Sequence, residues 1–133
     1  MRAAVLLALA VGCTHPPAPA ATTSGAGVDR DDDPPLEPAF AGPKGRCTKL
    51  ELRLANEISQ HLIGAWGDKS HVYVESVSGA PRDFVAFFAT KPACDRFRVV
   101  GTVVEVSGPA KGKATGTVTE LELDVERWWC LGT

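Results

Sequence analysis

Residues 94–130 decide the fold, and they read CDRFRVVGTVVEVSGPAKGKATGTVTELELDVERWWC. In the second half, Leu121, Leu123 and Val125 alternate with acidic residues, a period of two that places apolar side chains on one face of a strand. We expect the acidic side chains on the other face to contact water. Residues 96–106 are rich in valine on both faces, which is typical of a central strand. Glycines and a proline separate the two halves, so the stretch predicts one long β-hairpin.

Two features within this hairpin predict its details. Gly101 lies within the first predicted strand of the hairpin, where a glycine indicates a bulge, a bend or the close approach of another backbone. Cys94 and Cys130 lie at the two ends, about two positions out of register, and diagonal cross-strand residues are roughly 7–8 Å apart. A bulge would bring them within the roughly 4.4–6.8 Å Cα separation of a disulfide. We therefore predict a Cys94–Cys130 disulfide.

The segment before the hairpin predicts a helix. Thr48 and Glu51 have the spacing of a capping box, and apolar residues follow at helical intervals. This pattern favours a helix over residues 48–63. Residues 49–54 also alternate as a strand would, and in that alternative the helix begins near Ala55.

The order of elements predicts the fold class. Residues 71–77 and 84–89 are rich in β-branched and aromatic side chains and predict two more strands. Helix, strand, strand and hairpin give an α+β domain, in which a small antiparallel meander with a long C-terminal hairpin is packed by one helix. The hairpin sequence, VVGTVVEVSG leading to TELELDV, also resembles the first hairpin of OB-type barrels. That resemblance implies an OB-like ligand-binding module as an alternative.

The amino terminus predicts export. Residues 1–12 carry one positive charge and an apolar run too short to span a bilayer, as in a secretory signal peptide. The ending AVGC at residues 10–13 resembles the lipobox of bacterial lipoproteins. The resemblance implies cleavage before Cys13 and lipid attachment to its sulfur, a stable anchor in the membrane. With Thr14 next, it implies the outer membrane of the cell envelope, on the periplasmic or surface face. An ordinary secretory signal that happens to contain a cysteine is the alternative.

The next part of the chain predicts a tether. Residues 13–43 begin with the lipidated cysteine and continue with seven prolines and few core-forming residues, a composition typical of a disordered linker. Its aspartates predict a solvated acidic spacer, since residues 14–43 hold one arginine and five acidic residues. Residues 44–133 then form the domain, with twelve Lys/Arg and eleven Asp/Glu. This near-neutral balance gives no electrostatic footprint for nucleic acid, and we expect no nucleic-acid partner.

Few residues in the domain indicate chemistry. Once Cys13 is lipidated and the hairpin disulfide forms, Cys47 is left over; pairing of Cys47 with Cys94 or with Cys130 is the alternative. His61 and His71 have no further ligands at zinc spacing, so we expect neither a metal nor another cofactor. A small envelope enzyme that uses Cys47 or a histidine is the alternative.

Trp128 and Trp129 are the candidate partner contacts. Adjacent residues on a strand point to opposite faces, so one indole should enter the core. The other should lie on the surface, where a tryptophan can anchor a partner, unless another part of the chain covers it. The predicted function is therefore that of a membrane-anchored envelope lipoprotein. Its non-catalytic domain would bind an envelope protein or ligand, or play a structural part.

Overall fold

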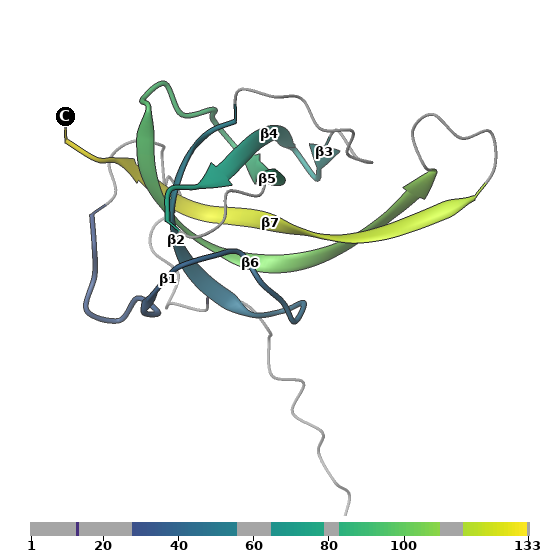
Figure 1. Cartoon of the computed structure of the whole chain (residues 1–133), viewed down its shortest axis with the longest axis horizontal. Coiled ribbons are helices and arrows are strands. Elements are labelled where there is room, and N and C mark those ends of the chain that lie inside the picture. The colour runs from purple at the N-terminus through teal and green to yellow at the C-terminus, as the bar shows by residue number, and fades with distance from the viewer. Residues whose placement is uncertain (1–12, 14–27, 56–64, 79–82, 110–115, 133) are drawn as a thin grey trace, which may run out of the picture.

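The computed structural model describes residues 13, 28–55, 65–78, 83–109 and 116–132 (Figure 1). In these residues the secondary structure is β, and all the strands belong to one mixed seven-stranded sheet. The strands are β1 Leu36–Glu37, β2 Cys47–Leu54, β3 Ala65–Trp66, β4 Lys69–Ser76, β5 Asp83–Phe88, β6 Arg96–Pro109 and β7 Thr117–Cys130. None of the described residues lies in a helix long and apolar enough to cross a membrane.

Five of the strands close into a barrel. β2 pairs with β6, β6 with β7, β7 with β5 in parallel, β5 with β4, and β4 pairs back with β2. A meander of three strands followed by a hairpin that closes on it is the connectivity of OB-type barrels. The β6–β7 hairpin supplies the last two barrel strands, whereas the sequence resemblance suggests the first two.

The predicted α+β class, with its helix over residues 48–63, is wrong. Cys47–Leu54 forms β2, in which Leu50 and Leu52 are fully buried and Arg53 is exposed. The alternation of residues 49–54 prevails over the helical spacing because β2 is paired with β6 and, near its end, with β4. The remainder of the predicted helix, residues 56–63, lies outside the described part of the chain.

The barrel interior holds the main hydrophobic core, to which all five barrel strands contribute. At its centre the rings of Phe88, Phe97 and Trp128 meet edge to face, with centroids 5.8–6.2 Å apart. Phe40 adds a ring stacked on Phe84 at 4.2 Å. Edge-to-face and stacked pairs contribute beyond their buried area. A residue of the predicted linker therefore packs against the core.

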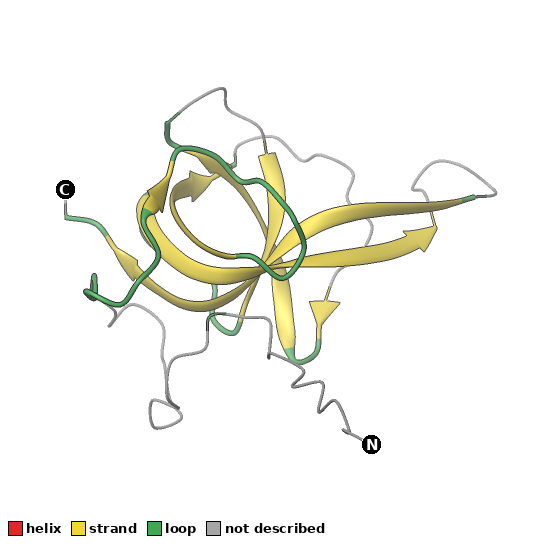
Figure 2. Cartoon of the chain, turned by 90° about the horizontal axis from the view of Figure 1, so that it is seen from below, coloured by secondary structure: helices red, strands yellow, loops and turns green. Residues whose placement is uncertain are grey.

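The predicted hairpin is present. β6 and β7 pair from Phe97 opposite Cys130 to Pro109 opposite Thr117, with a register shift between Val100 and Gly101. A Cβ atom at Gly101 would collide with the carbonyl oxygen of Asp124, so glycine allows the strands to approach there. In both views the far ends of β6 and β7 reach beyond the other strands (Figures 1 and 2). We call residues 104–109 and 117–122 the arm.

The predicted Cys94–Cys130 disulfide is also present, with its Cα atoms 6.0 Å apart. Cys130 lies opposite Phe97 in the ladder, three residues after Cys94. The loop before β6 brings Cys94 back to the end of β7, and Cys94 packs against the main core. The bond fixes the end of the hairpin opposite the arm.

Candidate functional site

Trp66 is the exposed tryptophan of the described residues, with 36% of its surface accessible. It ends β3, and a two-residue turn returns the chain into β4. Gly67 begins the turn with φ of +61°, a conformation that glycine adopts without strain. The indole stacks on Phe87 with ring centroids 6.0 Å apart. Lys69 Nζ donates to Oδ1 of Asp124 at 2.6 Å and holds this small hairpin against β7.

A pocket of about 350 Å³ lies between Trp66 and the start of the arm. Its lining residues are Lys44, Gly45, Trp66, Thr102, Val103, Val104 and Glu105. This volume is at the lower end of the roughly 300–1,000 Å³ of ligand pockets. An aromatic ring, two valines and side chains of both charge signs make the pocket suitable for a group that is partly apolar and partly polar.

Glu122 lies on the sheet face that carries this pocket. It is opposite Val104 in the β6–β7 ladder, and opposite residues of a ladder share a face. Glu122 is fully buried, and neither carboxyl oxygen has a hydrogen-bond partner. Burial, together with the nearby carboxyl group of Glu120, raises the pKa of Glu122 to about 9. The predicted water-facing position of this acidic residue is wrong, and the raised pKa favours its protonated form at neutral pH.

A second polar cluster lies on the outer face of β2, β6 and β7. Lys49 and Arg98 both contact Asp29, and Arg127 contacts Asp33. Only 1% of the Asp33 side chain and 9% of the Arg127 side chain are exposed. The sequence assigns both aspartates to a solvated spacer, whereas Asp33 is buried against the barrel. We call residues 28–33 with these three basic residues the acidic clasp.

The electrostatics of the clasp follow from burial and charge. The hydrogen bond from Lys49, with the charges of Lys49 and Arg98, lowers the pKa of Asp29. Burial lowers the pKa of Arg127, and the carboxylate of Asp33 opposes that shift. The Arg127 guanidinium also lies over the ring of Trp129, 4.8 Å from its centroid. The charged side chains of the acidic clasp thus cover the ring of Trp129.

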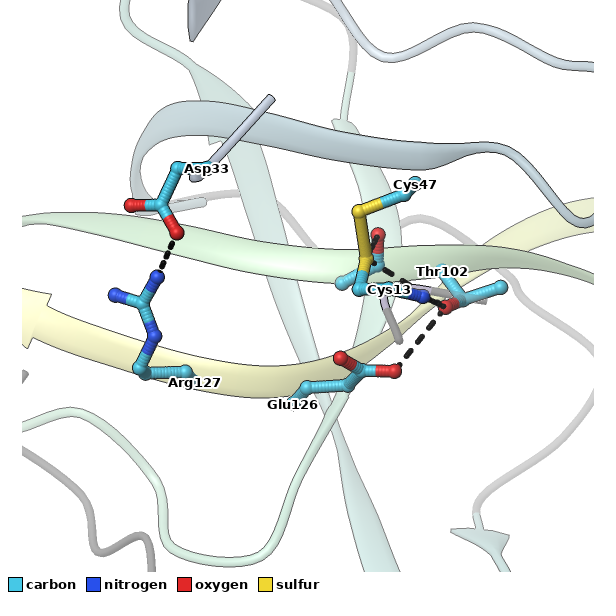
Figure 3. Close-up of a disulfide and its surroundings, with 7 residues drawn as sticks. Cys13, Asp33, Cys47, Thr102, Glu126 and Arg127 are labelled. Carbon is cyan, nitrogen blue, oxygen red and sulfur yellow. Dashed lines mark hydrogen bonds and ion pairs between the residues drawn. A yellow bond between two sulfur atoms is a disulfide. The ribbon is translucent and has the colours of Figure 1, made fainter. Parts of the chain in front are cut away.

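A second disulfide joins Cys13 to Cys47, with Cα atoms 4.9 Å apart (Figure 3). The backbone N–H of Cys13 donates to Oγ1 of Thr102 at 3.3 Å, and that hydroxyl donates to Glu126. Both cysteines pack with Val100 in a small cluster outside the barrel. Cys47 is therefore no free thiol in this form. A lipid thioether on Cys13 and this disulfide require the same sulfur atom.

The other predicted site residues lie apart from the pocket. Trp128 and Trp129 are 8% and 5% exposed, so neither offers an open ring to a partner. His71 lies edge to face with Tyr73 on the outer side of β4, and His61 falls outside the described residues. Among the described residues, no three His, Cys, Asp or Glu side chains are grouped as a metal site.

Sequence reasoning missed Trp66 and Glu122. A lone tryptophan next to Gly67 and Asp68 is a turn signal with an aromatic residue beside it, and this could have drawn attention to Trp66. No local signal distinguishes Glu122 from the acidic residues that alternate with it. Comparison with models of known protein families gives no match, and neither does comparison with curated proteins or with solved structures.

Proposed function

We propose that this protein is exported and binds a partner or ligand through its OB-type barrel without catalysing a reaction. The pocket beside Trp66 carries the proposal, because it places an exposed indole, stacked on Phe87, next to polar groups. Exposed tryptophans in such settings often supply much of a binding energy. The signal-like amino terminus and the Cys94–Cys130 disulfide, which is compatible with a lipid on Cys13, support export, since disulfides persist in oxidising compartments.

An envelope enzyme has less support from the described residues. In the form with the Cys13–Cys47 disulfide, Cys47 has no thiolate that could act as a nucleophile. His71 lies on the outer side of β4, where its neighbour is the ring of Tyr73, and it does not line the pocket. The pocket lining offers contact surface and hydrogen-bonding groups, which favours binding.

Trp66→Ala is expected to weaken binding at least about tenfold, because it removes the aromatic wall of the pocket. The probes are a library of linear dodecapeptides, chitotetraose and an oligodeoxythymidine, each tested by calorimetry on the full exported chain. Val118→Ala is the matched control, since Val118 is an exposed apolar residue on the arm. Absence of binding by every probe, or equal affinity in both variants, would contradict the proposal.

We also propose Cys13 as the site of a lipid anchor to the cell-envelope membrane. Lipid attachment to the precursor would consume the Cys13 sulfur before the domain folds, and Cys47, which is half-buried, would then be a thiol. In the structure, which has the disulfide, Cys13 carries no lipid. The two forms are alternatives for one atom, and they have different masses and thiol counts.

Intact mass and alkylation should distinguish these forms. From native membranes we expect an acylated chain beginning at Cys13, with one alkylatable thiol before reduction and three after it. From a chain exported on a signal without the lipobox pattern but with Cys13 retained, we expect no thiol before reduction and four after it. An unacylated, fully oxidised chain in the native membrane fraction would rule out the anchor.

A further inference from the structure

On the side of β6 that faces β2, only part of the strand has backbone hydrogen bonds to other described residues. Val103 accepts a hydrogen bond from the N–H of Gly45 at 2.6 Å and donates its own N–H to the carbonyl of Arg46 at 2.9 Å. These bonds continue the β2–β6 ladder, whose last pair is Cys47 with Thr102. Both backbone groups of Val103 therefore point toward the β2 side of the strand.

Beyond Val103 the same edge is open among the described residues. Alternate residues of an antiparallel strand direct their N–H and C=O groups to the same side. Glu105 and Ser107 therefore direct theirs to the β2 side, where no described residue bonds them. β7 pairs along the opposite side of the arm. An open edge of this kind is a template for another strand.

The pocket lies at the point where the edge becomes open. Gly45 ends the occupied part and Glu105 begins the open part, and both line the pocket with Trp66. Glu105 and Ser107 are exposed, and the far ends of β6 and β7 reach beyond the other strands (Figures 1 and 2). A strand added here would thus pass directly beside the indole.

We propose that an extended peptide segment of a partner protein adds to β6 at Glu105 and Ser107 and places one side chain in the pocket beside Trp66. The guest strand continues the path of Gly45 and Arg46 and runs antiparallel to β6. This inference rests on the proposed binding function and names its partner. Main-chain hydrogen bonds supply affinity in such strand addition, and the side-chain pocket supplies specificity.

The spacing of the open groups favours a peptide over a saccharide. Glu105 and Ser107 are two residues apart, so their backbone groups repeat at about 6.8 Å. A β-strand presents N–H and C=O groups at the same repeat, whereas the hydroxyl groups of a saccharide are not arranged as fixed pairs of N–H donors and C=O acceptors. Lys44 and Glu105 place opposite charges at the pocket, which suits a peptide that carries both N–H and C=O dipoles.

The test uses linear dodecapeptides selected by phage display on the full exported chain and then synthesised for fluorescence anisotropy. Glu105→Pro and Ser107→Pro should each weaken binding at least about tenfold, because each removes an outward N–H without touching the β6–β7 bonds. Ser107→Ala keeps that N–H and should bind within about twofold of the parent. Glu105→Ala keeps its N–H but removes a charge at the pocket, and it should bind more tightly than Glu105→Pro. Trp66→Ala should weaken binding as the proline variants do.

Amide exchange on the unmodified chain gives a second measurement that does not depend on the variants folding. The amides of Glu105 and Ser107 should become protected when peptide binds, and the amide of Val118 should not change. If the selected peptides bind Glu105→Pro and Ser107→Pro as tightly as the parent, strand addition would be overturned. If the same peptides bind Trp66→Ala more weakly, the proposed binding function would still stand. If no peptide can be selected but chitotetraose or oligodeoxythymidine binds, strand addition would likewise be overturned and the proposed binding function would stand. Dimers that dissociate only in the proline variants would make a second copy the occupant and overturn the inference.

Discussion

Asp33→Asn is expected to lower the free energy of unfolding by about 3 kcal/mol, because it removes the carboxylate that pairs directly with the buried Arg127 guanidinium. The two side chains are 1% and 9% exposed, so water cannot replace the lost partner. In the variant, the carbonyl oxygen of Val28 and the ring of Trp129 still contact Arg127. The expected loss of stability is therefore at the lower end of the range for breaking a buried ion pair. Urea denaturation followed by tryptophan fluorescence measures the change.

Asp31→Asn is the matched control for this variant. It makes the same chemical change two residues away at an exposed position, and we expect an effect within about 0.5 kcal/mol. A double variant with Asp33→Leu and Arg127→Met should regain most of the loss, since an apolar pair of similar size avoids the uncompensated charge. Equal stability of Asp33→Asn and Asp31→Asn would show that the acidic clasp does not hold residues 28–33 on the barrel.

The hairpin could be predicted from the sequence because its determinants are local. Alternation in residues 121–125, valines in residues 96–106 and glycines between them each indicate a strand or a turn without knowledge of other segments. Gly101 and the Cys94–Cys130 bond follow from the same hairpin geometry. These features therefore needed no information from the rest of the chain.

The other features depend on partners that are distant in the sequence. β2 satisfies two periodicities, and its pairing with β4 and β6 decides between them. Residues 28–43 have a composition typical of a linker, yet Asp33 and Phe40 find partners on the barrel. Trp66 becomes exposed and fixed only because Phe87 and the β7 strand support it from elsewhere. Such contacts are tertiary, and composition does not encode them.

Glu122 provides the second large expected effect, a stability that falls as the pH rises. Its pKa is about 9 in the folded chain and 4.5 in an unperturbed chain, so between these values only the folded state keeps the proton. The free energy of unfolding should therefore fall by about 1.4 kcal/mol for each pH unit across this range. Between pH 5 and pH 8 the parent protein should lose roughly 4 kcal/mol from this group. Urea denaturation at several pH values measures the slope.

Glu122→Gln removes the titrating carboxyl group, so the free energy of unfolding should no longer fall with pH across this range. This expectation holds even if the buried amide lowers the stability at every pH. Glu105→Gln, an exposed change on the facing strand, should leave the slope as it is. In Glu120→Gln the free energy of unfolding should stop falling at a lower pH than in the parent, because the carboxyl group of Glu120 is a secondary cause of the raised pKa of Glu122. Burial is the main cause, the carboxyl group of Glu120 adds to it, and together they favour the protonated form of Glu122 in the folded state. A parent protein equally stable at pH 5 and pH 8, with the same profile in Glu122→Gln, would mean that Glu122 is ionised in the folded chain and has found a partner or water.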